Sequence, residues 1–316
     1  MNGLDLVAGG AGFIGSHLVD ALLAQGRRVR VLDDLSTGHR ANLETALANV
    51  RLEVMEGDAA DPDTARKACI GVERIFHFAA RPSVPWSVAH PQAALRANHG
   101  TTLALLEAAS GAGTRAFVFS SSSAIYGERP EQPKREDQEP DPRSPYATHK
   151  WMGEQAVRAT ARAGGPAGAC LRYFNVYGPR QDPSSPYSGV ISIFAREARA
   201  GRAATIHGDG GQTRDLVHVT DVVRANLLAA ECMPLRNPDP APVLNVGRGE
   251  SRSVRELWDL VCAAAGRQPA PEPNFAPTRA GDVRHSRSDC ARAEALIGWH
   301  AAINLADGLR ATLAEI

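Results

Sequence analysis

The sequence predicts an α/β protein: a doubly wound parallel sheet with a smaller mixed α/β lobe. Three observations predict this class. Glycines at positions 9, 12 and 15 separate an apolar run from a helical pattern. Strand and helix signals then alternate through the first half of the chain, and the pattern loosens after about residue 176. Alternating strands and helices are typical of a parallel sheet covered by helices on both faces.

The first unit is a strand, a glycine-rich turn, a helix and a second strand. Residues 4–8 form an apolar run, a helical pattern begins at Phe13, and Gly26 is placed to end that helix. Residues 29–32 form the second strand, which runs into Asp33. In such a unit the glycines permit a tight turn, close approach of backbone N–H groups to a pyrophosphate, and close packing of helix on strand. The spacing therefore predicts a Rossmann-like dinucleotide site at the positive end of the helix.

The remaining signals set the domain organisation. Strands are predicted at 52–55, 74–79, 116–119 and 170–175, with helices over 101–109 and from Tyr146 onward. Residues 129–145 are rich in proline and charge and are predicted to form a surface loop. We expect residues 1–175 to form the dinucleotide-binding domain, joined by a returning segment near 215–247, and residues 176–316 to form mainly the second lobe.

Composition excludes several classes of function. The 35 basic and 35 acidic residues leave no net charge, which argues against a nucleic-acid partner. The five cysteines form no CxxC pair and the ten histidines show no ligand spacing, so no metal site and no disulfide framework is predicted. No signal peptide or membrane-spanning run is evident, so a cytoplasmic protein with reduced thiols is expected.

Asp33 indicates which dinucleotide binds. It lies 18 residues after Gly15, at the end of the second strand. A carboxylate there can accept hydrogen bonds from the ribose hydroxyls of NAD and repels the additional phosphate of NADP. The prediction is NAD, although His39 and Arg40 leave a phosphate-tolerant site open. Asp58 and Ala59 follow the third strand and are candidates for the adenine pocket.

A second group of polar residues points to proton transfer. Tyr146 and Lys150 are four residues apart, so a helix places them on one face. Ser122 belongs to a serine run directly after the strand at 116–119, where α/β folds place their chemistry. A nearby ammonium is expected to lower the pKa of the phenol from its usual value of about 10. Tyr146 would then act as a base on an alcohol or sugar hydroxyl.

Motifs in order along nearly the whole chain carry a family resemblance. They are Gly9-Gly10-Ala11-Gly12-Phe13-Ile14-Gly15, Leu32-Asp33-Asp34-Leu35, Glu56-Gly57-Asp58, His77-Phe78-Ala79-Ala80, the run 120–127, Ser144-Pro145-Tyr146 with Lys150, the run 171–180, Gly208-Asp209-Gly210 with Thr213-Arg214-Asp215, and Arg279-Ala280-Gly281-Asp282. With these motifs the chain resembles the extended short-chain dehydrogenases/reductases, and among them the UDP-sugar 4-epimerases.

The resemblance implies a mechanism with three catalytic residues. Tyr146 would take the proton of the sugar 4-OH, Ser122 would share that hydrogen bond, and Lys150 would bind the nicotinamide ribose. Hydride would pass from C4 to NAD and return to the other face of a transient 4-keto sugar. The expected partner is a UDP-sugar bound by the second lobe. The chain is also expected to form a homodimer through helices near 92–110 and 146–163.

The same resemblance implies two sets of binding residues. The cofactor set is Gly9, Gly12, Phe13, Ile14, Gly15, Asp33, Asp34, Asp58, Ala59, Phe78, Ala79, Ala80, Asn98, Tyr146, Lys150 and Tyr173. The substrate set is Ser83, Ser122, Ser123, Tyr146, Asn175, Gly189, Val190, Arg214, Arg279, Asp282 and Ser286. Ser286 occupies the position that gates the sugar 2-substituent in this family, and a small residue there admits N-acetyl sugars. UDP-GlcNAc and UDP-GalNAc are thus expected substrates, with or without UDP-Glc and UDP-Gal.

Other reactions of the superfamily fit the sequence less well. Dehydratases carry an Asp-Glu pair where this chain has Ser123 and Ala124, and decarboxylases keep a Glu at the position of Ala124. Uronate epimerases usually have Thr in place of Asn175. A nucleotide-sugar reductase or dehydrogenase stays an alternative, and a non-catalytic NAD-binding sensor is a remote one. Ala8 and Pro82 depart from the family's usual residues near the cofactor and the sugar.

Overall fold

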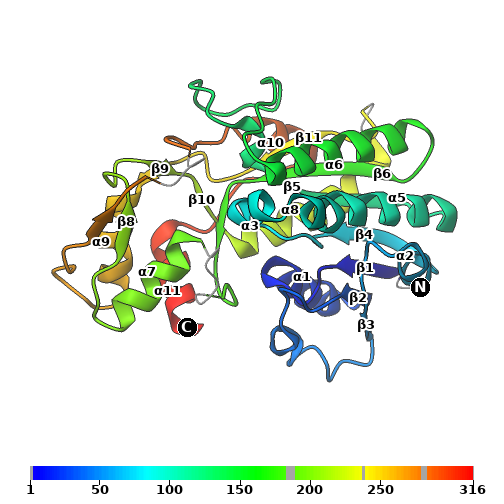
Figure 1. Ribbon diagram of the computed structural model, residues 1–316. Helices are drawn as coiled ribbons and strands as arrows, with labels where there is room; N and C mark the ends of the chain where they lie inside the picture. The colour runs from blue at the N-terminus through cyan, green and yellow to red at the C-terminus, as the bar shows by residue number, and fades with distance from the viewer. Residues whose placement is uncertain (1–2, 183–188, 237–238, 279–282, 316) are drawn as a thin grey trace.

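A seven-stranded parallel sheet forms the centre of the protein. The computed structural model describes residues 3–182, 189–236, 239–278 and 283–315. The strand order is β11-β6-β5-β4-β1-β2-β3 (Figure 1). The strands are β1 (Leu4–Ala8), β2 (Arg28–Asp33), β3 (Leu52–Glu56), β4 (Val72–His77), β5 (Ala116–Ser122), β6 (Ala167–Tyr173) and β11 (Val243–Val246). The predicted doubly wound α/β fold is confirmed. The chain adds β2 and β3 on one side of β1 and then β4 onward on its other side, and folds of this class bind ligands at the point where the order reverses.

Helices cover both faces of this sheet. One face carries α1 (Phe13–Ala24), α8 (Val219–Arg236) and α10 (Ala291–Ile297), and the other carries α2 (Pro62–Cys69), α5 (Thr101–Ala112) and α6 (Pro145–Arg162). Successive side chains of β1 point to opposite faces of the sheet. Leu6 packs into the apolar cluster that contains Leu105, and Val7 packs into the cluster that contains Leu18. All of β1 is buried for this reason, as expected of a central parallel strand.

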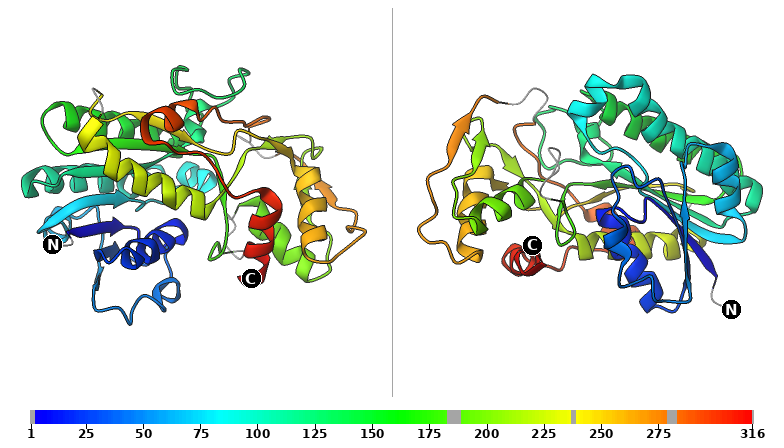
Figure 2. Two further views of the ribbon diagram at one scale, coloured as in Figure 1. Left: turned by 180° about the vertical axis from the view of Figure 1, so that it is seen from behind. Right: turned by 60° about the horizontal axis from the view of Figure 1, so that its bottom comes forward.

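The second lobe is built from three helices and short strand pairs. Its helices are α7 (Val190–Arg199), α9 (Val254–Ala264) and α11 (Leu305–Glu315). Figure 2 shows them grouped beyond one end of the sheet. Their core centres on Phe194 and Trp258, whose rings meet edge to face at 5.3 Å. The strand pairs are β8 (Thr205–His207) with β13 (Asn274–Ala276), β9 (Thr213–Arg214) with β12 (Arg252–Ser253), and β7 (Asn175–Tyr177) with β10 (Leu216–His218).

The chain crosses between the sheet and the second lobe several times. After β7 and α7 it returns through α8 and β11 to the sheet, where β11 pairs with β6. Helix α10 packs on α8 and β11, although it follows the lobe residues in sequence. A division near residue 175 with a returning segment at 215–247 stays a prediction, because the described contacts do not themselves define domains.

Two predicted strands differ from the observed ones. The strand expected over 170–175 is two strands: β6 ends at Tyr173, and β7 begins at Asn175 because its partner is β10 instead of the central sheet. The strand expected over 74–79 ends at His77. A Cβ added to Gly9 would lie 2.6 Å from the backbone nitrogen of Ala79, so the chain after His77 passes directly over the glycine turn.

Short helices connect the main elements. They are η1 (Arg40–Leu43), α3 (Val84–Ala89), α4 (Pro91–Leu95), the π-helical turn η2 (Arg96–Gly100) and η3 (Ser123–Tyr126). Residues 129–145, predicted as a surface loop, contain no helix before α6 begins at Pro145. In the described ranges no helix combines the length and the apolar character that crossing a membrane requires.

Candidate active site

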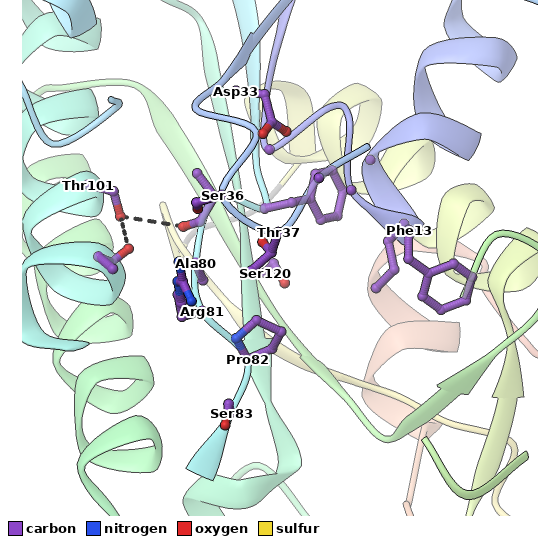
Figure 3. Close-up of a pocket in the computed structure, with 18 of the residues that line it drawn as sticks. Phe13, Asp33, Ser36, Thr37, Ala80, Arg81, Pro82, Ser83, Thr101 and Ser120 are labelled. Atoms are coloured by element: carbon purple, nitrogen blue, oxygen red, sulfur yellow. Dashed lines mark hydrogen bonds between the residues drawn. The ribbon is translucent and has the colours of Figure 1, made fainter. Parts of the chain in front are cut away.

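A cavity of about 790 Å³ lies at the carboxyl ends of the central strands. The glycine turn after β1, Asp33 at the end of β2, and Ser120–Ser122 at the end of β5 all contribute to its wall. Figure 3 shows Asp33 near one end, Ala80, Arg81, Pro82 and Ser83 following one another along the wall, and Phe13 across from them. Every residue predicted for the cofactor lines this cavity except Asn98.

The glycine turn has the geometry that its sequence predicts. Gly9 has a φ of 81°, in the left-handed region, and its N–H donates to the Leu32 carbonyl over 2.8 Å. A Cβ on Gly15 would lie 2.2 Å from the Gly9 carbonyl oxygen, so this position admits no side chain. Gly12 starts α1 without a side-chain cap. The free N–H groups of the first helical turn therefore lie at the N-terminus of α1, which borders the cavity. Such a helix N-terminus is a ready site for an anion.

Asp33 connects the second strand to the glycine turn. One carboxylate oxygen accepts the Ala11 N–H over 2.9 Å and the other accepts the Leu35 N–H over 2.9 Å. Each oxygen keeps a lone pair for a further donor, such as a ribose hydroxyl. Burial raises the pKa of Asp33, and the two backbone hydrogen bonds partly offset that rise.

Ser122, Tyr146 and Lys150 meet in the same cavity wall. Tyr146 lies in the first turn of α6, which Ser144 caps by accepting the Ala147 N–H over 3.2 Å. The Ser122 side chain interacts with the Tyr146 phenol and lowers its pKa. Lys150, one turn later, is 3% exposed, and its Nζ donates to the Ser120 carbonyl over 2.7 Å. The i,i+4 spacing thus brings the phenol and the ammonium to the end of β5.

The expected lowering of the Tyr146 pKa is wrong for this structure. Burial raises the pKa of the phenol, and only the interaction with Ser122 opposes that rise. The Lys150 ammonium points to the Ser120 carbonyl and lies 5.9 Å from the centroid of the Tyr146 ring. Burial also lowers the pKa of Lys150 to about 8. Spacing predicted that the two groups are neighbours, but it carried no information on the desolvation that governs both pKa values.

A buried ion pair, Glu154 with Arg172, is hydrogen-bonded to the serine run at the end of β5. The Glu154 carboxylate on α6 accepts from Arg172 Nε and Nη2 of β6, each over 2.8 Å, and from Ser121 Oγ over 2.5 Å. Both charged side chains are almost fully buried. Since Ser121 lies between Ser120 and Ser122 in the cavity wall, this pair fixes the end of β5 that carries these serines.

Asn98 is placed beside the cavity and not in its wall. It is fully buried in η2, and its Oδ1 accepts the Arg81 N–H over 2.7 Å. Asn98 Nδ2 is buried without a partner among the described residues. Tyr173 does line the cavity, and its hydroxyl donates to Asn226 over 2.9 Å.

The residues present fit a bound dinucleotide. The glycine turn and the uncapped end of α1 suit a diphosphate, and Asp33 suits a ribose. At the far end Asp58 lines the cavity and pairs with Arg96 over 2.6 Å. The cavity volume falls within the range that accommodates small-molecule ligands. In the described part of the chain, no three His, Cys, Asp or Glu side chains are grouped to hold a metal ion.

The predicted substrate residues divide into three groups. Ser83, Ser122 and Tyr146 line the cavity. The others that are described lie outside its lining: Ser123 in η3, Asn175 in β7, Gly189 and Val190 at the start of α7, Arg214 in β9, and Ser286 in the loop 283–290. Arg279 and Asp282 lie outside the described residues.

Several lining residues were not predicted from the sequence. They are Ser36, Thr37, Gly38 and His39 after β2, Arg81, Trp86, Ala93, Arg96, Ala97 and Thr101 around α3 to α5, and Gln181 and Asp182 after β7. The first four follow Asp33 directly, so their place in the chain was a usable signal. The pairing of Arg96 with Asp58 joins residues 38 positions apart and has no local signature.

Comparison with known proteins places the chain among enzymes that act on nucleotide sugars. Residues 6–247 match the model of the NAD dependent epimerase/dehydratase family. The UDP-glucose 4-epimerase of Mycolicibacterium smegmatis is 42% identical over 98% of this chain and 96% of its own length. The UDP-N-acetylglucosamine 4-epimerase of Methanobrevibacter ruminantium, solved with UDP-N-acetylmuramic acid, is 34% identical with a TM-score of 0.92 over 99% of this chain and 98% of that one. The Thermus thermophilus UDP-glucose 4-epimerase, solved with NAD, is 36% identical with a TM-score of 0.86 over the same shares of the two chains.

Proposed function

Because this chain belongs to the NAD dependent epimerase/dehydratase family, we propose that it interconverts the C4 epimers of a UDP-hexose through a transient 4-keto sugar. The chain is an NAD-dependent isomerase, and the predictions of family and cofactor are confirmed. One observation carries the proposed route: Ser122, Tyr146 and Lys150 line the same cavity as the glycine turn.

Each of the three side chains has a distinct task in the proposed reaction. NAD, when bound, supplies a hydride acceptor and donor. Tyr146 takes the proton from the sugar 4-OH and later returns it to the 4-keto oxygen. Ser122, which interacts with the phenol, hydrogen-bonds the sugar oxygen during the transfer and orients it. Lys150 stabilises negative charge on the phenol when its ammonium turns from the Ser120 carbonyl toward the ligands.

The environment of Tyr146 favours transient proton transfer. A phenol whose pKa is raised by burial is protonated at neutral pH, so it holds its proton until a charged partner lowers that pKa. Binding of positive charge beside the ring would supply that change, and Lys150 on the same helix face is the protein's own source of it. The phenol would then release its own proton to solvent, and the resulting phenolate would take the proton of the sugar 4-OH only in the loaded site.

The proposed substrates are UDP-GlcNAc and UDP-GalNAc, alongside UDP-Glc and UDP-Gal. Asn175, Arg214, Arg279 and Asp282 are proposed to hold the UDP moiety, and Ser286 to leave room for the 2-acetamido group. The side chain of Arg214 donates to the Val283 carbonyl over 2.8 Å, which joins β9 to the loop that carries Ser286. The relatives include enzymes named for both sugar classes, which supports a site that accepts both.

The test uses the purified protein without added cofactor. UDP-GlcNAc and UDP-Glc are incubated separately, and proton NMR follows the axial and equatorial signals at C4. We expect both substrates to equilibrate with their C4 epimers. Net oxidation of the sugar, or absence of the second epimer, would contradict 4-epimerisation.

A single substitution tests the proposed specificity. Ser286→Tyr places a bulky ring where the acetamido group is expected, so turnover of UDP-GlcNAc should be lost while turnover of UDP-Glc is kept. Ser286→Ala is the matched control, because it changes the same position without adding volume. Unchanged activity of the tyrosine variant on both sugars would overturn the proposed role of Ser286.

The homodimer stays a prediction. Two leucines on the helices near 92–110 support it: Leu95 is 43% exposed and Leu103 is 48% exposed. Contiguous exposed apolar patches mark association surfaces, and we propose that these two side chains contribute to such a patch in the homodimer.

A further inference from the structure

One glutamine side chain is hydrogen-bonded to the main chain on both sides of Ser286. Gln132 Nε2 donates to the His285 carbonyl over 3.0 Å, and Gln132 Oε1 accepts the Arg287 N–H over 3.1 Å. Gln132 belongs to the segment between β5 and α6, more than 150 positions earlier in the chain. Its carboxamide therefore bridges two peptide groups that meet at a single residue.

Those two peptide groups determine the conformation of Ser286. The His285 carbonyl belongs to the peptide plane before the Ser286 Cα, and the Arg287 N–H belongs to the plane after it. Peptide groups are planar, so the orientations of these two planes define φ and ψ of the residue between them. Fixing φ and ψ also fixes the direction of the Cα–Cβ bond, and for a side chain as short as serine this confines the hydroxyl to the three staggered positions about that bond.

The backbone beside Gln132 keeps the two segments in register. The Lys134 N–H donates to the Arg287 carbonyl over 2.7 Å, and the Asp289 N–H donates to the Lys134 carbonyl over 2.9 Å. Lys134 and Ser288 form a parallel bridge. These bonds hold residues 287–289, but they do not reach the peptide before Ser286. Among the described contacts, the Gln132 carboxamide is what joins this segment to the His285 carbonyl.

The same loop is anchored to strands that lead to the cavity. The buried Asp215 carboxylate accepts the Ser288 N–H over 2.8 Å and the Ser288 hydroxyl over 2.6 Å. Asp215 lies just before β10, which pairs with β7, and Val176 of β7 lines the cavity. The loop 283–290 is thus fixed at Ser288 on one side of Ser286 and at Arg284, whose carbonyl accepts the Thr213 N–H over 2.9 Å, on the other. Gln132 is the side chain that bonds both peptide groups flanking Ser286 itself.

We propose that Gln132 is a positioning residue for sugar selection: its carboxamide sets the orientation of Ser286 and hence the space left for the sugar 2-substituent. The inference rests on the proposed role of Ser286. Gln132 touches no reacting group, so its loss should act on substrate affinity and leave the chemical step intact.

The test compares three variants of the full-length protein. Gln132→Met keeps the side-chain length and removes both hydrogen bonds, and Gln132→Glu keeps the acceptor for Arg287 N–H but loses the donor to His285. Gln138→Met is the matched control, because Gln138 lies in the same segment and, among the described residues, its side chain accepts the nearby Arg135 N–H over 3.2 Å. The readouts are KM and kcat for UDP-GlcNAc and UDP-Glc, and hydrogen exchange at the Arg287 amide.

The expected result is a change in selectivity at constant kcat. Losing both hydrogen bonds should raise the KM for UDP-GlcNAc relative to that for UDP-Glc by about fivefold or more, since each hydrogen bond contributes a modest net free energy to the loop conformation. The Arg287 amide should exchange about tenfold faster or more in Gln132→Met, because its acceptor is gone, and less so in Gln132→Glu. Gln138→Met should match the parent protein in both readouts.

Three outcomes overturn the inference in distinguishable ways. If Ser286→Tyr abolishes UDP-GlcNAc turnover but Gln132→Met keeps the parent KM ratio, Gln132 has no positioning role and the proposed function stands. If Ser286→Tyr leaves both sugars unaffected, the proposed specificity fails and the inference fails with it. Unchanged exchange at Arg287 in Gln132→Met would show that the hydrogen bond itself does not hold this loop.

Discussion

Removing Glu154 should destabilise the protein far more than removing the whole ion pair. Glu154 is 0% exposed and Arg172 is 3% exposed, and the carboxylate accepts two hydrogen bonds from the guanidinium. In Glu154→Leu the guanidinium stays buried without a counterion, and the Ser121 hydroxyl loses its acceptor. Breaking a buried pair in this way costs about 3–5 kcal/mol in the free energy of unfolding.

The double variant Glu154→Leu/Arg172→Met removes both charges together. Replacing a buried pair by apolar side chains of similar volume is often neutral, so we expect most of the loss to be recovered. The remaining cost is about 1 kcal/mol for the unpaired Ser121 hydroxyl. The two substitutions should therefore be coupled by about 2 kcal/mol or more.

Urea unfolding of the parent, both single variants and the double variant measures this coupling. Thermal unfolding gives a second readout, with a fall in Tm of roughly 5–15 °C expected for Glu154→Leu. If the free energy of unfolding of Glu154→Leu lies within about 1 kcal/mol of the parent value, the reasoning is refuted, because a substitution at an exposed surface position costs no more than that. Equal instability of the single and double variants would refute it as well.

Two further predictions concern the catalytic groups. Burial lowers the pKa of Lys150 to about 8 in the folded protein, below the value of about 10.4 in an unfolded chain. Between these values the unfolded state binds more protons, so Lys150 should make stability rise with pH in this window. Lys150→Met should remove that contribution, and urea unfolding of both proteins from about pH 7 to about pH 10 checks it; parallel pH profiles would contradict the prediction. Tyr146→Phe should lower kcat by about 10²–10⁴-fold with little change in stability, because it removes proton transfer while keeping the ring; initial-rate measurements and thermal unfolding check this, and full activity would exclude Tyr146 as the base.

Local spacing was enough to predict the parts of the site that lie close together in sequence. The glycine turn, the helix after it and Asp33 form one contiguous unit, so their arrangement follows from residues 4–33 alone. Tyr146 and Lys150 were placed together by the helical period, and Ser122 by its position at the end of a strand. These are the residues that the structure brings into one cavity.

Features that depend on the environment or on distant residues were not predicted. The direction of the Tyr146 pKa shift was wrong because burial raises the pKa while the Lys150 ammonium points to the Ser120 carbonyl, and spacing reports neither. The pairing of Arg96 with Asp58 and the contact of Gln132 with the loop around Ser286 join segments with no common local pattern. The break between β6 and β7 arises because Asn175 pairs with a strand from later in the chain.

The central claim is that the sugar loses and regains the same hydride at C4 while Tyr146 moves the proton. The most direct test is incubation of UDP-glucose deuterated at C4 with the enzyme in ordinary water, followed by NMR of the epimerised product. We predict that the deuterium stays at C4 in the product, because the hydride never mixes with solvent. Replacement of that deuterium by solvent hydrogen would contradict the claim.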